Sequence, residues 1–73
     1  MACMNSDGSL VSAARRLLEA ARTPAAPADL AARAGLPLYR VHSALRELGE
    51  AGLVTERDGA YAVTREGLAR LER

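Results

Sequence analysis

The chain has 73 residues, 49% of them hydrophobic, and ten basic against nine acidic residues leave a net charge of +1. This length allows one small domain with one core, and the near-neutral charge excludes the global basic field that drives tight nonspecific nucleic-acid binding. Because the chain has no Phe or Trp, the core must be built mainly from Leu, Val and Ala. Residues 1–8 are small, polar and without periodicity, so we expect a flexible leader before a domain spanning 9–73.

A single cysteine, Cys3, excludes an internal disulfide and a cysteine-based zinc site. The amino terminus lacks the basic and apolar regions of a signal peptide, and no stretch approaches the ~20 apolar residues of a membrane span. We therefore expect a cytoplasmic protein with no membrane partner. The sequence also lacks a nucleophile near a base, paired carboxylates in a predicted cleft and a phosphate-binding glycine loop, so we expect no enzymatic activity, cofactor or metal.

Two helices are predicted in the first half of the chain. Apolar residues recur at helical spacing over 10–22, with Ser9 as a candidate N-cap and Thr23-Pro24 as the end. After a short extended piece, Pro27 starts a second helix that reaches Ala34, and Gly35 supplies the left-handed residue that ends many helices.

The corner Gly35-Leu36-Pro37 leads into a third helix, predicted over 38–51. Its apolar stripe consists of Val41, Ala44, Leu45 and Leu48. Counting 100° per residue, the opposite face carries Tyr39, Ser43, Arg46 and Glu50, with Arg40 and His42 on its flanks. This outward face is the candidate functional surface.

A β-hairpin is predicted over 53–63, because Asp58-Gly59 separates two β-rich segments and is a strong two-residue turn signal. In that register Val54 pairs with Val63 on one face. Thr64 is then expected to cap a short last helix, 65–73.

A helix-turn-helix followed by a hairpin predicts a small α+β fold, a winged helix-turn-helix with a three-helix core, a two-stranded β-hairpin wing and a short C-terminal helix. The segments LAARAGLP, RVHSAL and LGEAGLV resemble the shared frame of winged-helix domains in bacterial transcription regulators of the MarR and IclR families. The glycine-leucine-proline corner is closer to the IclR-like form. Tyr61, Val63, Thr64 and Gly67 resemble the MarR-like ending of the wing.

This resemblance implies a DNA-binding transcription regulator that inserts helix 38–51 into the major groove of double-stranded DNA. On that helix it implies DNA contacts by Leu38, Tyr39, Arg40, His42, Ser43 and Arg46. An arginine there can bind guanine bidentately. On the wing, Arg57 would enter the minor groove and Arg65 would meet a phosphate. Useful specificity would favour a homodimer, for which we consider the helix 10–22 and the Leu68/Leu71 face.

A protein-interaction module is the alternative hypothesis. Leu38 and Tyr39 are bulky groups at the start of an exposed helix and could anchor a protein partner. Glu56 and Asp58 flank Arg57, and their repulsion from the DNA backbone offsets much of what one arginine gains. A continuous positive strip would favour DNA, whereas charges neutralised by neighbouring carboxylates would favour protein.

Overall fold

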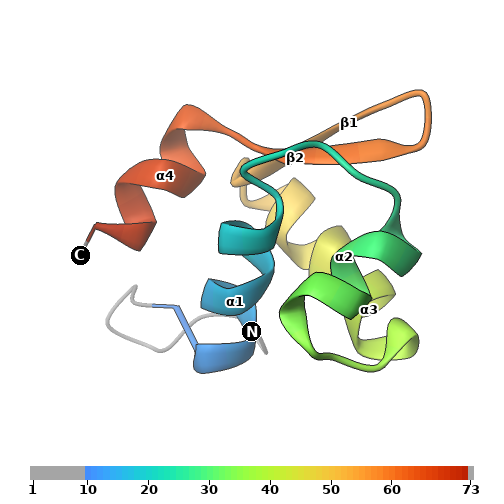
Figure 1. Cartoon of the computed structure of the whole chain (residues 1–73). Coiled ribbons are helices and arrows are strands. Elements are labelled where there is room, and N and C mark those ends of the chain that lie inside the picture. Colours follow the sequence, from blue (N-terminus) through green and yellow to red (C-terminus); the bar gives the residue numbers. More distant parts are fainter. Residues whose placement is uncertain (1–9, 73) are drawn as a thin grey trace.

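The computed structural model describes residues 10–72, so the expected leader 1–8 and the candidate cap Ser9 lie outside the described residues. Over these described residues the fold is small α+β, with four helices and one antiparallel hairpin. In chain order its elements are α1 (Ser12–Ala20), α2 (Pro27–Ala34), α3 (Leu38–Glu50), β1 (Val54–Arg57), β2 (Ala60–Val63) and α4 (Arg65–Leu71). In Figure 1, α1 lies in the middle, α4 lies on one side of it and α2 and α3 lie on the other.

The first helix is shorter than its apolar pattern predicts. It begins at Ser12, and Val11 occupies the N-cap position without a side-chain hydrogen bond. Leu10 is buried but forms an extended bridge instead of helix, so its apolar side chain serves the core from outside α1. At the other end α1 stops at Ala20, before Pro24 could end it.

The second and third helices follow the sequence prediction closely. Pro27 starts α2, and Gly35 ends it with a φ of 68° in the left-handed region. The N–H of Leu36 donates to the carbonyl of Ala31 at 3.0 Å, which fixes the corner before α3. The third helix ends at Glu50, one residue before the predicted end.

The hairpin has the predicted register throughout. Its pairs are Val54–Val63, Thr55–Ala62, Glu56–Tyr61 and Arg57–Ala60. Both turn residues have positive φ, 52° at Asp58 and 84° at Gly59, as a type I′ turn requires. The predicted extended piece before α2 also joins this hairpin, because Ala25 and Tyr61 exchange two backbone hydrogen bonds of 3.2 and 2.9 Å.

One aliphatic core holds these elements together. Its largest fully buried side chains are Leu17, Leu18, Leu30, Leu48, Leu53 and Val41. Leu71 is only 9% exposed and Leu68 packs against the same core. The face of α4 that we considered for a dimer is therefore used inside the chain. The guanidinium of Arg15 donates two 2.9 Å hydrogen bonds to the carbonyl of Leu71 and fastens α4 to α1.

Between residues 10 and 72, no helix combines the length and the apolar character needed to cross a bilayer.

Candidate interaction surface on α3

The predicted contact residues all lie at the surface. The exposed residues predicted to contact DNA are Tyr39, Arg40, His42, Ser43, Arg46, Arg57 and Arg65. For the five residues on α3, exposure follows from the way this helix packs, since Val41, Leu45 and Leu48 face the core and the 100° step per residue turns the other faces to solvent. Leu38 is also exposed, at 45%, and Tyr39 is 73% exposed.

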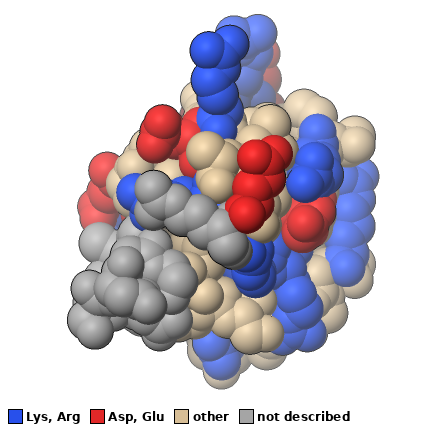
Figure 2. All heavy atoms as spheres, turned by 90° about the vertical axis from the view of Figure 1, so that its left-hand side faces the viewer, with Lys and Arg blue, Asp and Glu red and all other residues tan. Residues whose placement is uncertain are grey.

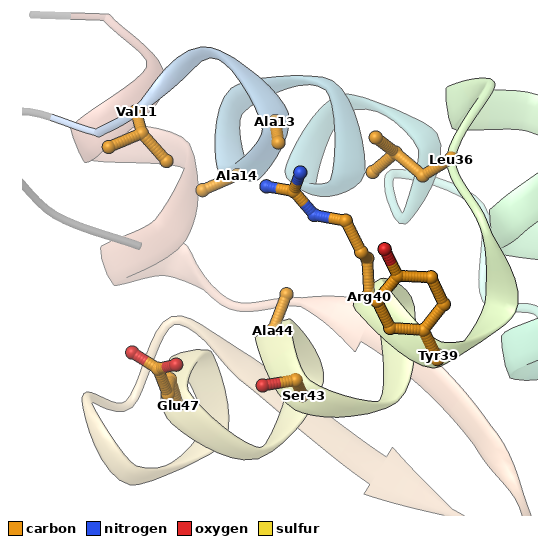
Figure 3. A pocket seen from close by; sticks show the side chains of 9 residues that line it. All are labelled: Val11, Ala13, Ala14, Leu36, Tyr39, Arg40, Ser43, Ala44 and Glu47. Atoms are coloured by element: carbon orange, nitrogen blue, oxygen red, sulfur yellow. The ribbon is translucent and has the colours of Figure 1, made fainter. Parts of the chain in front are cut away.

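A groove runs between α3 and the amino-terminal half of α1, with a volume of about 300 Å³. Its lining residues are Val11, Ala13, Ala14, Leu36, Tyr39, Arg40, Ser43, Ala44 and Glu47. Figure 3 shows Val11 at the end near Glu47, and Leu36 with Tyr39 at the other end. The side chain of Arg40 extends from α3 across the groove toward α1 (Figure 3).

Arg40 and Arg46, the two arginines on the predicted DNA-contacting helix, lie on different flanks of α3. Arg40 and Arg46 are six residues apart, which places them about 120° apart around the helix. Arg40 lines the groove, whereas Arg46 lies outside its lining. They therefore belong to different flanks of α3 and do not converge on one point.

The net charge of α3 and the hairpin does not favour binding of phosphate groups. From 38 to 63, which covers α3 and the hairpin, the chain carries three arginines and four carboxylates, a net charge of −1 with histidine neutral. Along the chain Arg40 and Arg46 are followed by Glu47, Glu50 and Glu56, and Arg57 lies between Glu56 and Asp58. Glu56 accepts a 2.7 Å hydrogen bond from the N–H of Gly59, so its carboxylate stabilises the hairpin turn. On the face over α4, seen in Figure 2, basic and acidic side chains are likewise interspersed.

The surplus of arginines lies instead on 12–34, with four arginines and two carboxylates. Several of these have structural partners. Arg33 donates to the carbonyls of Thr23 and Ala20 at 3.0 and 3.3 Å, tying α2 to the end of α1. Arg22 pairs with Glu19 at 2.7 Å, and this hydrogen bond and charge raise the pKa of the Arg22 guanidinium. Arg22 and Arg33 therefore have partners within the chain.

No group of three or more metal-ligating side chains occurs among residues 10–72. His42 is exposed on the side of α3 away from the groove.

Sequence reasoning missed the contribution of α1 to this surface. Val11, Ala13 and Ala14 form the second wall of the groove, and helical periodicity by itself assigned this helix only to the core. The signal available in the sequence is that Val11 and Ala13 are apolar residues at the edge of the stripe, and the structure shows both half-buried.

No protein-family model matches the chain, and no curated protein is significantly similar to it. Solved structures similar to this chain include two methyltransferases. One is an O-methyltransferase family protein from Burkholderia thailandensis, 26% identical over 78% of this chain with a TM-score of 0.65. The other is CalO1, a methyltransferase in calicheamicin biosynthesis in its SAH-bound form, 33% identical over 81% of this chain with a TM-score of 0.67. This chain spans 17% and 18% of those two chains, so the likeness concerns less than a fifth of either protein.

Proposed function

We propose that the chain is a winged helix-turn-helix domain of the kind these methyltransferases contain, and that it works as a non-catalytic protein-interaction module of a methyltransferase. In this assignment α2 and α3 form the helix-turn-helix, the hairpin is the wing and α1 completes the three-helix core. The support is the 33% identity over 81% of this chain, combined with the small share of the methyltransferase that it spans.

We choose a protein partner over DNA because α3 exposes large hydrophobic side chains and lacks a net positive charge. Its exposed large hydrophobic residues are Leu38 and Tyr39, and Tyr39 lines the groove, while α3 and the hairpin together carry a net charge of −1. Duplex DNA presents one negative charge per ~1.7 Å of its axis, so a segment without net positive charge gains little from phosphate. Exposed aromatic residues next to a hollow are typical of protein interfaces.

Copurification tests this function. The tagged chain, expressed in its own host, is expected to recover a methyltransferase polypeptide at constant stoichiometry, identified by mass spectrometry. Tyr39→Ala is expected to reduce the recovery several-fold, whereas Arg46→Ala, on the other flank of α3, is expected to leave it unchanged. Recovery without any methyltransferase polypeptide, or with one that Tyr39→Ala does not affect, would contradict the proposal.

DNA binding is the second candidate function, that of a bacterial transcription regulator in the cytoplasm. The observation that favours it is that all seven predicted contact residues are exposed on α3, the hairpin and the start of α4. It predicts that duplex DNA at low salt perturbs the amide resonances around Arg46 and Arg57, with an affinity that falls steeply as salt rises. Unperturbed resonances at these positions would reject this candidate and leave the first one standing.

A further inference from the structure

A second hollow, the α1–α2 pocket, lies between the first two helices and has a volume of about 490 Å³. It shares no lining residue with the groove between α1 and α3. Its lining consists of Arg15, Arg16, Glu19, Ala20, Arg33 and Ala34. Three guanidiniums and one carboxylate give this lining a net charge of +2. The pocket is therefore a place where an anionic group would be attracted.

The carboxylate in the lining has a partner outside the pocket. Glu19 accepts a 2.7 Å hydrogen bond from the Nε of Arg22, and Arg22 is not a lining residue. This ion pair compensates the charge of Glu19 without using a guanidinium of the pocket. The positive charge of the lining thus remains for a group from outside the chain.

Arg33 is held in position by the backbone at the end of α1. Its Nη1 donates to the carbonyl oxygens of Thr23 and Ala20 at 3.0 and 3.3 Å. A guanidinium has five N–H donors, so these bonds leave the donors on Nε and Nη2 for another acceptor. Because the two carbonyls already orient the side chain, an acceptor that binds Arg33 costs little rotamer entropy.

Arg16 brings a second guanidinium to the pocket from the other helix. It is exposed, and its Nη1 lies 3.8 Å from the position that a Cβ would have on Gly35. Its side chain therefore reaches from α1 to the end of α2. Between the arginines, Ala20 and Ala34 have short side chains that leave the hollow open.

We propose that the α1–α2 pocket receives carboxylate side chains of an acidic segment of the methyltransferase polypeptide, bound by Arg16 and Arg33. This inference rests on the proposed function, since it adds a second contact with the same partner. Charge complementarity supports it, because residues 12–34 carry a net charge of +2 and residues 38–63 carry −1. An acidic segment is attracted to the first region only. Arginine also binds carboxylates bidentately, which fixes the orientation of the partner.

Charge reversal at Arg16 tests the contact with the partner. Recovery of the methyltransferase polypeptide with the tagged chain is expected to fall at least about tenfold for Arg16→Glu, because like charges would then meet. Arg16→Lys keeps the charge and loses the planar fork, so we expect a smaller loss. Arg46→Glu makes the same charge change outside the pocket and is the matched control, with unchanged recovery expected. Circular dichroism checks that each variant is folded.

A titration with hexaglutamate peptide tests the pocket without the methyltransferase. Nuclear magnetic resonance of the unmodified chain is expected to show saturable shifts of the Nε–Hε signals of Arg16 and Arg33. These shifts should shrink as salt is added, because salt screens the attraction between exposed charges. The signal of Arg46 should not move. In the Arg16→Glu variant, the response at Arg33 is expected to be lost.

Equal shifts at Arg16, Arg33 and Arg46 would overturn this inference, because the peptide would then be attracted to any arginine of the surface. Equal recovery of the methyltransferase polypeptide by Arg16→Glu and the unmodified chain would overturn it too, and would leave the proposed function standing. Recovery of no methyltransferase polypeptide contradicts the proposed function instead. The hexaglutamate titration then still decides whether the pocket binds carboxylates.

Discussion

Gly67, in α4, marks the closest approach between this helix and the chain entering the hairpin. A Cβ atom built there would overlap the carbonyl oxygen of Leu53 and a methyl group of Val63. Replacing a helical glycine with alanine ordinarily stabilises a helix by ~1 kcal/mol, but overpacking a tight site costs ~1–3 kcal/mol. The carbonyl belongs to the backbone and cannot turn aside as a side chain can, so the clash dominates.

We therefore expect Gly67→Ala to lower the free energy of unfolding by about 1–3 kcal/mol in urea titrations. Gly49→Ala in α3 is the matched control, because a Cβ there meets only a methyl group of Val54 at 3.9 Å, an ordinary contact. We expect that change to be neutral or to stabilise by up to ~1 kcal/mol. Equal effects at the two sites would contradict this account of Gly67.

At the scale of elements, the junction between the hairpin and α4 depends on one hydroxyl group. The Oγ1 of Thr64 donates to the carbonyl of Gly52 at 2.7 Å and accepts from the N–H of Gly67 at 3.1 Å. It therefore caps α4 and joins it to the turn that follows α3. A seven-residue helix cannot hold its shape alone, so this cap and the core contacts of Leu71 maintain it.

Thr64→Ala removes both hydrogen bonds and is expected to destabilise the fold by about 1–2 kcal/mol. Hydrogen exchange of the Gly67 N–H should accelerate, because that group loses its acceptor. Thr64→Ser keeps the hydroxyl and is expected to retain most of the stability. A serine variant as unstable as the alanine variant would assign the effect to the lost methyl group and not to the cap.

For the whole molecule, an aliphatic core in a chain this short gives a small margin of stability, about 3–5 kcal/mol. Any partner that binds only the folded state then raises the melting temperature by mass action. A methyltransferase polypeptide that binds the α3 face should therefore raise the melting temperature of the unmodified chain and not that of the Tyr39→Ala variant. Calorimetry with and without the copurified polypeptide measures this, and equal shifts for the two proteins would contradict it.

Much of the fold could be predicted because it depends on local patterns. Asp58-Gly59 determines the hairpin register, since two positive φ angles are needed and these residues adopt them readily. Pro27 and Gly35 set the bounds of α2, and Thr64 sets the start of α4. Both ends of α1 were predicted too far out, because Leu10 before the helix and Ala21 after it serve the core without belonging to it.

The sequence by itself determined the elements, their order and which face of α3 meets solvent, since spacing along one chain encodes each of these. Only the tertiary structure decided what that face consists of. It brought Val11 and Ala13 beside Arg40 to form a groove, set Arg40 and Arg46 on separate flanks relative to α1, and turned Leu71 into the core. The reason is that a groove needs two walls, and the packing of α1 against α3 joins residues about thirty positions apart, a relation that no local period contains.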